Sequence, residues 1–386
     1  MLKKMLMCFC LFAYMLGVSA GTDGVVEDNK KGDVAVKNLT RAMTLLDNTI
    51  DKCFKGSDLH MCDLYHLGNG RQEGTADVWP YTAAMEAVNG VMEALQTLKG
   101  NCPELYAKNM ERYKCLMARL FDNLDYYKGT YTLTSYTQTK EWSVYGVHRS
   151  NTKGTAKVEG IENVYDDQMW PVRELVRAYR NTGEKRYLVE AEYLADYVID
   201  GWDCTLDADG HENGGITWGP GYNSKHSCSN APIISPLVWL SQIYKDSKDT
   251  AVWRYVAADG KRKSKKISKH DLYLMFAEKV YEWQKRKLMN EKTGCYWDML
   301  GADGKMRYEN VGGKRYRANV PNGGPVGTEF TYNSGTMLCG AADLLQVTGS
   351  NVYRTDLTQL AKATYLNFRG KARTIDGTAH YPFPYD

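Results

Sequence analysis

Apolar residues recur at helical spacing along most of this chain. One stripe runs from Met169 to Tyr179 and another from Leu188 to Val198, each at steps of three and four residues. Such steps place apolar side chains on one face of a helix. Comparable stretches predict seven further helices, near 35–54, 77–98, 104–126, 231–245, 270–289, 335–347 and 355–368. The pattern therefore predicts an all-α fold.

Short glycine turns join these helices in pairs. Thr182-Gly183 ends one helix and Tyr187 opens the next, and Thr348-Gly349 with Tyr353 repeats the arrangement. Glycine just past the last helical residue is a common helix stop. Helical hairpins bury their apolar faces only by stacking on one another, so we expect an array of them. The loops between hairpins are polar and unequal, which favours a ring over a regular superhelix; they lie at 127–162, 200–228, 247–268 and 291–330.

The first twenty residues have the features of an export signal. Lys3 and Lys4 precede an apolar run that ends at Val18-Ser19-Ala20. We expect residues 1–20 to be a signal peptide, 21–34 a polar leader and 35–386 a single domain. The apolar run has no cysteine at its end, so we favour a freely exported protein, periplasmic or secreted, over a lipid-anchored one. No second apolar run approaches the ~18 residues needed to span a bilayer.

Composition and charge narrow the functional classes. The 49 Lys and Arg residues against 46 Asp and Glu give a net charge of +3, too little to attract nucleic acid by bulk electrostatics. The 28 Tyr and 9 Trp residues supply a large core and exclude disorder. A basic run over 261–266 contains no aromatic residue, so we interpret it as a solvated loop. Asp207-Ala208-Asp209-Gly210 lacks the later ligands of a calcium loop and is interpreted as a turn.

Eight cysteines follow the expected signal peptide: Cys53, Cys62, Cys102, Cys115, Cys204, Cys228, Cys295 and Cys339. An oxidising compartment permits disulfides, although their pairing cannot be deduced from a sequence. Our first hypothesis pairs Cys204 with Cys228, because they bracket one glycine-rich segment. A zinc site is disfavoured because the spacing lacks a tight half-site; it would use Cys53, His60, Cys62 and His66. We expect neither a metal nor a cofactor.

The strongest candidate for chemistry is Asp166-Asp167, at the entrance of a predicted helix. One aspartate suffices to cap a helix, and two adjacent ones repel each other. Glycoside hydrolysis needs one ionised and one protonated carboxyl acting on the same bond. Adjacent Cα atoms ~3.8 Å apart can place two carboxyl groups about 5 Å apart, the separation of retaining enzymes. Ionising one carboxylate also raises the pKa of its neighbour.

Flat and polar side chains near the aspartates are candidate sugar contacts. Tyr165 and Trp170 flank the pair, and Trp218 follows Gly214-Gly215, where paired glycines let the backbone approach a ligand. Trp218 suits a buried core position equally well. Asn230 suits the N-cap of the next helix, whose first turn accommodates Pro232. The candidate substrate contacts are Tyr165, Trp170, Trp218, Tyr222, Asn223 and Asn230.

The combined motifs resemble glycoside hydrolase family 76 from about residue 35 to 370. They are Tyr165-Asp166-Asp167 with Trp170, Gly214-Gly215-Ile216 with Trp218, Ser229-Asn230-Ala231, and Thr331-Tyr332-Asn333 with Gly335. The resemblance implies an (α/α)6 toroid and endo-acting hydrolysis of α-1,6-mannan with retention of configuration. It assigns Asp166 as the nucleophile and Asp167 as the general acid/base. The implied partner is a polysaccharide, mannan, without nucleic acid.

The chain also departs from the implied pattern. Nine predicted helices are fewer than the twelve that six hairpins need, so we expect a toroid that is incomplete at the C-terminus. The alternative function is a non-catalytic or weakly active glycan-binding relative that uses Trp170, Trp218 and Tyr222. A magnesium-dependent prenyl- or terpene-type barrel is not favoured, because Trp170 stands where Asp-Asp-x-x-Asp has its third acid.

Overall fold

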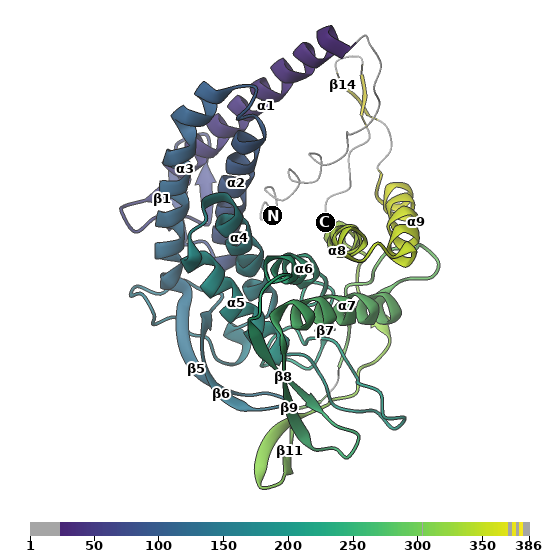
Figure 1. Ribbon diagram of the computed structural model, residues 1–386. Helices are drawn as coiled ribbons and strands as arrows, with labels where there is room; N and C mark the ends of the chain where they lie inside the picture. Colours follow the sequence, from purple (N-terminus) through teal and green to yellow (C-terminus); the bar gives the residue numbers. More distant parts are fainter. Residues whose placement is uncertain (1–23, 303, 370–372, 376–377, 381–386) are drawn as a thin grey trace. The chain divides into compact units, whose positions relative to one another are not determined.

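The computed structural model describes residues 24–302, 304–369, 373–375 and 378–380 (Figure 1). The expected signal peptide, residues 1–20, lies outside the described residues. Helices make up 51% of the chain, and every helix predicted from periodicity is present. Within the described ranges the α-helices are α1 (Gly24–Cys53), α2 (Val78–Thr97), α3 (Pro103–Leu124), α4 (Asp166–Thr182), α5 (Lys185–Asp200), α6 (Ile234–Ile243), α7 (Lys269–Leu288), α8 (Thr331–Thr348) and α9 (Asn351–Phe368).

The polar leader and the segments predicted as loops contain regular secondary structure that the sequence analysis did not predict. Residues 24–34 of the polar leader belong to α1. Short sheets occur in the predicted loops and in two further segments, 54–73 and 373–380. Periodicity analysis missed them because it searched for helical steps and not for side chains that alternate between two faces. The paired strands are β1 (Phe54–Lys55) with β2 (His60–Met61), β3 (Leu64–His66) with β4 (Arg71–Glu73), β5 (Lys128–Thr134) with β6 (Thr139–Tyr145), β8 (Thr250–Val256) with β9 (Arg262–Ser268), β11 (Arg307–Val311) with β12 (Lys314–Ala318), and β14 (Arg373–Ile375) with β15 (Thr378–His380). A three-stranded sheet places β10 (Met299–Leu300) between β7 (Lys225–His226) and β13 (Pro325–Val326).

The chain divides into two compact units. Unit 1 comprises the chain up to Lys128 with Val147–Ala156 and Arg177–Tyr187. Unit 2 comprises Gly129–Gly146, Lys157–Val176 and the chain from Leu188 onward. The single domain predicted over 35–386 stays a prediction. No helix in the described ranges combines the length and the apolar character that crossing a bilayer requires.

Unit 1 is built around the packing of α2 against α3. Pro103 opens α3, where its missing N–H costs nothing. Tyr81 is fully buried and its hydroxyl donates to the Leu120 carbonyl at 3.1 Å, while its ring lies 5.3 Å from that of Tyr127. The hydroxyl thus satisfies a buried polar group inside an aromatic core.

The four residues of the disfavoured zinc site lie in unit 1 and do not converge. Cys62 donates its backbone N–H to the Cys53 carbonyl at 2.8 Å, across the β1–β2 hairpin. His60 instead contacts Thr75, and His66 contacts Glu73. Each imidazole is therefore committed to a neighbour other than a shared metal position.

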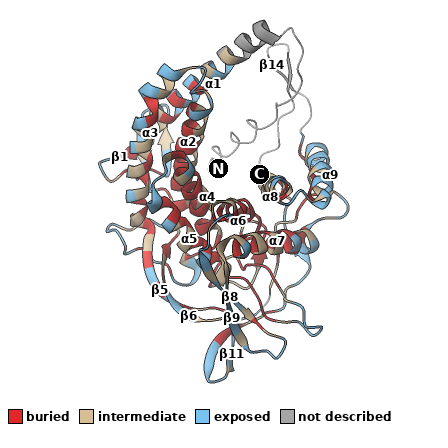
Figure 2. Cartoon of the chain, viewed as in Figure 1, coloured by how far each residue is buried: buried red, intermediate tan, exposed pale blue. Residues whose placement is uncertain are grey.

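Unit 2 has its core where α6, α7 and α8 pack together, and most of α6 is buried (Figure 2). A Cβ added to Gly340 of α8 would lie 2.9 Å from Ile234 Cγ2, so glycine permits the close approach of α8 to α6. Gly349 ends α8 with φ of 67°, as the Thr348-Gly349 repeat predicts. The Ser268 hydroxyl caps α7 by accepting from the Asp271 backbone N–H at 3.0 Å.

Candidate active site

Asp166 and Asp167 form the first turn of α4, in unit 2. The chain that leads into them is fixed, since the Tyr165 N–H donates to the Trp218 carbonyl at 2.8 Å and the Asn163 side chain donates to the Tyr197 hydroxyl at 2.8 Å. Asp167 is 8% exposed and Asp166 is half-buried. Free backbone N–H groups at a helix N-terminus favour carboxylates, so this position stabilises negative charge on both acids.

Burial raises the pKa of Asp166 to about 6. Four groups oppose that rise: the Cys228 thiol, the Asp166 and Asp167 backbone N–H groups and the Trp218 indole. Asp166 Oδ1 and Trp218 Nε1 are both buried, and neither has a partner at normal hydrogen-bond distance, so the indole acts on the carboxyl from further away. Asp166 is therefore ionised at neutral pH with an acceptor position still open, which suits a carboxylate that must react or bind.

Cys228 lies against Asp166, and this overturns the proposed pairing with Cys204. The Cys228 thiol hydrogen-bonds to the Asp166 carboxyl, and its pKa is raised well above the usual range, first by burial. Cys204 is buried elsewhere, where burial raises its pKa to about 12. Both cysteines are free thiols. The sulfur of Cys228 is committed to an acid, a role that spacing in the sequence does not indicate.

An aromatic cluster stands beside the aspartates. Trp218 stacks on His226, with ring centroids 4.9 Å apart and planes 24° apart, and lies 4.7 Å from the Tyr222 ring. Trp218 and Tyr222 are both half-buried, and Asp166 is close enough to contribute to the raised pKa of Tyr222, after burial and Glu162. Burial lowers the pKa of His226 to about 4, so the imidazole is neutral at physiological pH. The cluster offers a half-exposed flat surface next to a carboxylate.

Arg317 of β12 fixes the loop that carries this cluster. Its guanidinium, in a residue only 3% exposed, donates to the Pro220 carbonyl at 3.2 Å and to the Tyr222 carbonyl. Within the loop, a Cβ on Gly219 would lie 2.2 Å from the Asn163 carbonyl oxygen, so only glycine fits there. Sequence analysis missed Arg317 because it placed residues 291–330 in a loop. An isolated arginine in a polar segment gives no signal of burial.

Tyr165 is a core residue in this structure. It is 1% exposed, its ring lies 5.1 Å from that of Tyr197, and a Cβ on Gly201 would overlap it at 2.5 Å. Such packing supports the entrance of α4 and leaves a sugar contact by Tyr165 without a structural basis. Trp170, one turn further along α4, is half-buried.

The Asn230 side chain is also occupied with the protein backbone in this structure. Its Oδ1 accepts from the Ile216 N–H at 2.8 Å, and its Nδ2 donates to the carbonyls of Ile216 and His226 at 2.9 and 2.7 Å. The residue is fully buried, so these backbone groups use its hydrogen-bonding capacity. Asn223 is half-buried and donates to the Gly304 carbonyl at 3.1 Å.

Gly214 and Gly215 make room for a tryptophan, where the sequence suggested a ligand. A Cβ on Gly215 would lie 2.3 Å from Trp283, and one on Gly214 2.6 Å from the same ring. Beneath them, the Lys225 ammonium donates to Asp203 at 2.8 Å and to the Gly214 carbonyl at 2.6 Å. This buried ion pair holds the glycine segment in place.

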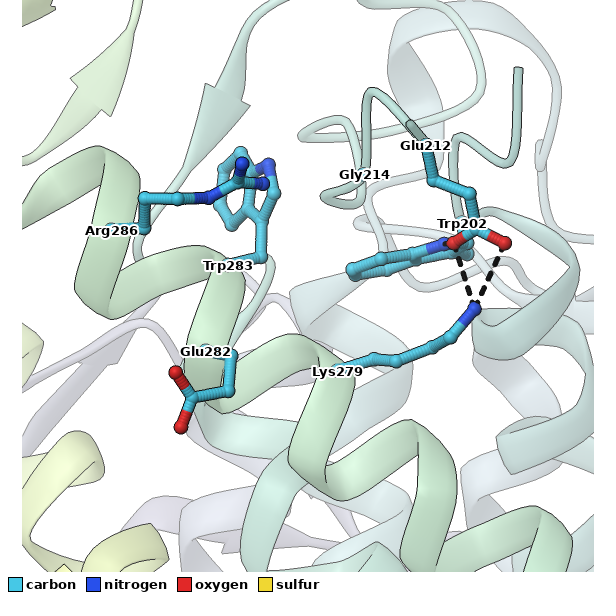
Figure 3. Close-up of a pocket in the computed structure, with 7 residues that line it drawn as sticks. All are labelled: Trp202, Glu212, Gly214, Lys279, Glu282, Trp283 and Arg286. Carbon is cyan, nitrogen blue, oxygen red and sulfur yellow. Dashed lines mark hydrogen bonds and ion pairs between the residues drawn. The ribbon is translucent and has the colours of Figure 1, made fainter. Parts of the chain in front are cut away.

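A cavity of about 250 Å³ opens beside this segment (Figure 3). Lys279 reaches from α7 to the Glu212 carboxylate at 2.7 Å, and the Trp202 indole N–H donates to the same carboxylate at 2.8 Å. Neither Asp166 nor Asp167 lines the cavity. Its lining residues are Trp202, Glu212, Gly214, Lys279, Glu282, Trp283 and Arg286.

Asp207, Asp209 and His211 form an exposed group on the turn predicted from the sequence. The Gly210 N–H donates to the Asp207 carbonyl at 3.1 Å, and Gly210 has a φ of 82°. Within the described residues this is the one group of three or more His, Cys, Asp or Glu side chains close enough to share an ion. The Asp207 carboxylate already accepts from the backbone N–H groups of Asp209 and His211. The turn explains the motif without a cation.

Several solved structures that resemble this fold are described as family 76 enzymes. A family 76 glycoside hydrolase from a bovine Bacteroides thetaiotaomicron strain superimposes with a TM-score of 0.60 at 19% identity, over 89% of this chain and 60% of that one. A family 76 mannosidase of B. thetaiotaomicron VPI-5482 gives 0.55 at 19% identity, over 89% and 76%. A family 76 α-mannanase of B. thetaiotaomicron gives 0.54 at 15% identity, over 88% and 74%. At these identities the likeness concerns the fold.

The family match is more specific than the fold likeness. Comparison with curated protein sequences finds no match. The sequence model of glycosyl hydrolase family 76, in contrast, matches residues 81–257 and 265–378, well over half of the chain, and both aspartates lie inside the first segment. This chain belongs to glycosyl hydrolase family 76.

Proposed function

We propose that this protein is a retaining glycoside hydrolase that cleaves the α-1,6-linked backbone of mannan with Asp166 and Asp167. The observation that carries the proposal is the acid pair in the first turn of α4, with one carboxyl whose pKa is raised to about 6 and whose Oδ1 has no partner. Family membership supports hydrolysis, and similarity to an α-mannanase and a mannosidase supports the choice of mannan.

The proposed reaction has two steps. In the first, an Asp166 oxygen forms a bond to the anomeric carbon, the glycosidic bond breaks, and the proton of Asp167 passes to the leaving oxygen. In the second, Asp167 takes a proton from water, the water oxygen attacks the anomeric carbon, and the Asp166 ester bond breaks. Trp218 and Tyr222 would support the sugar ring beside the acids. Two inversions at one carbon retain its configuration.

Replacing either acid should abolish turnover. We expect Asp166→Asn and Asp167→Asn each to lower kcat on linear α-1,6-mannan by at least about 10³-fold, because each removes a group that bonds to the reacting atoms or moves a proton. Asp246→Asn, on an exposed aspartate beyond α6, is the matched control and should keep wild-type activity. Thin-layer analysis of the digests measures the products. Mannan binding by a wild-type protein that releases no product would favour the glycan-binding alternative.

Chemical rescue separates the two roles. With Asp167→Ala, added azide should restore turnover of an activated mannoside and give a glycosyl azide of retained configuration. With Asp166→Ala, azide would occupy the place of the nucleophile and give the inverted product. The raised pKa of Asp166 is a property that general acids also have, so the reverse outcome would exchange the two roles.

Two wider features belong to the same proposal. We infer that the helical hairpins form an (α/α)6-type ring, which the fold likeness to family 76 structures supports. We also propose export to the periplasm or medium, supported by Lys3, Lys4 and the apolar run that follows them. Both fit an enzyme whose polymeric substrate lies outside the cytoplasm.

A further inference from the structure

Two neighbouring hairpins of unit 2 expose a dense set of cations, here called the basic hairpin surface. The β8–β9 hairpin and the β11–β12 hairpin are tied together by Arg262, whose guanidinium donates to the Glu309 carboxylate and lies 4.6 Å from the Tyr316 ring centre. Figure 1 shows the two hairpins next to each other. The exposed cations of the surface are Lys261, Lys263, Lys265, Lys266, Arg307, Lys314 and Arg315.

Few acids neutralise these cations. Asp259 lies 3.6 Å from Lys261 and 3.8 Å from Lys263, and Glu309 is engaged by Arg262. In the part of the chain that the structure describes, no carboxylate lies within ion-pair distance of the other five, Lys265, Lys266, Arg307, Lys314 and Arg315. The surface therefore carries a local excess of positive charge that the net charge of +3 for the whole chain conceals.

Strand pairing adds aromatic rings to the cations. Trp253 stands opposite Lys265 and Tyr255 opposite Lys263, and the two rings lie 4.7 Å apart. On the second hairpin the Arg315 guanidinium lies 3.9 Å from the ring centre of Tyr308, which is 40% exposed. Rings beside ammonium and guanidinium groups can receive a sugar face and an anionic substituent at the same time.

The Trp253 ring lies near Lys279, a residue that lines the cavity of Figure 3. The Lys279 ammonium lies 5.6 Å from the Trp253 ring centre and 5.9 Å from that of Trp202, which lines the cavity. Arg286 also lines the cavity, and within the described residues it has no ion-pair partner. Lys279 is therefore a neighbour of both the Trp253 ring and the cavity, whose charged lining consists of Glu212 and Glu282 together with Lys279 and Arg286.

The turn of the first hairpin is a feature of this chain more than of its family. The family match stops at residue 257 and resumes at 265, so the turn and the first lysines of the basic run lie between the matched segments. Shared catalytic needs therefore do not explain these lysines.

We propose that the basic hairpin surface binds an anionic polysaccharide, one that carries phosphate or sulfate esters, at a site separate from the aspartate pair. The choice of polysaccharide over another polyanion rests on the proposed function, and charge complementarity supports the anionic character. Ammonium and guanidinium groups would pair with the esters, while the rings of Trp253, Tyr255 and Tyr308 would contact the sugars. Held there, the polymer would be retained near the enzyme between cleavage events.

Affinity electrophoresis of the full-length protein tests this surface. The probes are dextran sulfate, a phosphorylated mannan, neutral dextran and single-stranded DNA. We expect retardation by at least one of the anionic polysaccharides. Retardation by one alone identifies the ester that the surface prefers, and retardation by both shows that it accepts either. The triple variant Lys263→Gln, Lys265→Gln, Lys266→Gln should bind at least about tenfold more weakly, because it removes three cations. The matched control Lys245→Gln, Lys248→Gln, Lys292→Gln removes three other exposed cations of unit 2 and should bind like the wild type.

Activity on neutral α-1,6-mannan separates this proposal from the proposed function. The lysine variant should cleave neutral mannan at the wild-type rate, since its changes lie outside the aspartate site. A wild-type protein that binds the anionic glycan without cleaving mannan would remove the proposed function and leave the binding surface standing. The binding proposal is overturned by three results: no retardation of the wild type, an equal loss in the control, or DNA binding as tight as that of the anionic polysaccharides.

Discussion

As the proposed nucleophile, Asp166 must be ionised and must also be partly shielded from water. Burial raises its pKa to about 6, while hydrogen bonds from the Cys228 thiol and neighbouring groups limit the rise. A fully desolvated aspartate would stay protonated at neutral pH and could not act as a nucleophile. A solvated one would be ionised but less reactive. The thiol of Cys228 therefore helps to set the pH above which the proposed nucleophile is available.

Removing this thiol should move the pH dependence of the reaction. In Cys228→Ala the carboxylate loses a donor, so the pKa of Asp166 rises and the acidic limb of kcat/KM shifts upward by about half to one pH unit. Cys228→Ser keeps a donor and should leave the limb near its wild-type position. The measurement is the pH profile of kcat/KM on linear α-1,6-mannan.

Cys115, an exposed thiol on α3, supplies the control for this experiment. Cys115→Ala should reproduce the wild-type profile. If Cys228→Ala lowered activity equally at every pH, the thiol would serve packing alone and its role toward Asp166 would have to be withdrawn. Rescue by serine, but not by alanine, marks a positioning residue.

At the scale of elements, backbone contacts hold the site together. Asn230 joins the Ile216 strand segment to β7, and Arg317 joins β12 to the loop of Trp218 and Tyr222. Asn230 is four residues from His226, but it is 14 residues from Ile216, and Arg317 is 95 residues from Tyr222. The motif Ser229-Asn230-Ala231 was recognised from its pattern, but the direction of the Asn230 side chain depends on a segment fourteen residues away.

Asn230→Ala distinguishes a structural role from a substrate contact. The change leaves the Ile216 N–H without its acceptor and removes one donor from each of two buried carbonyls, which then share the Ser229 hydroxyl. We therefore expect a loss of about 2–4 kcal/mol in the free energy of unfolding. Urea denaturation measures the loss. A side chain that only touched sugar would instead raise KM with stability unchanged, and that result would restore Asn230 to the substrate contacts.

The β8–β9 hairpin contains a cross-strand pairing that the sequence analysis did not predict. The basic run at 261–266 contains no aromatic residue, which favoured a solvated loop. It is in fact largely strand β9, and antiparallel register brings Trp253 opposite Lys265 from twelve residues upstream. Adjacency across a sheet comes from pairing, and periodicity within one strand does not reveal the partner.

At the scale of the whole molecule, two groups of the site act on folding in opposite directions. Asp166 has a folded pKa near 6, above the ordinary 3.8, so its ionisation destabilises the fold above pH 6 and the penalty is relieved as pH falls toward 3.8. His226 has a folded pKa near 4, below the ordinary 6.5, so its contribution is full above pH 6.5 and is lost as pH falls toward 4. Between about pH 4 and pH 6, a fall in pH therefore stabilises the fold through Asp166 and destabilises it through His226.

Single variants should separate the effects of Asp166 and His226 on the pH dependence of the unfolding free energy. Asp166→Asn removes the buried charge, so relative to the wild type we expect a gain of about 1–3 kcal/mol in unfolding free energy at pH 7 that disappears near pH 4. His226→Gln should show the reverse trend, with its stability relative to the wild type improving as pH falls from 6.5 to 4. Urea titrations across this range measure both. Parallel curves for wild type and Asp166→Asn would show that the carboxyl is not desolvated in the fold.

The helices, the glycine stops and the position of the acid pair could be predicted from the sequence, because periodicity, helix termination and adjacent carboxylates are local properties. It also carried the family resemblance, since motif order is a one-dimensional pattern. Three-dimensional packing was needed to reveal that Cys228 faces Asp166, that Tyr165 and Asn230 are buried, and that Arg317 binds the backbone of the Trp218 loop. Burial and cross-strand register depend on which distant segments pack together, and that information is spread over the whole chain.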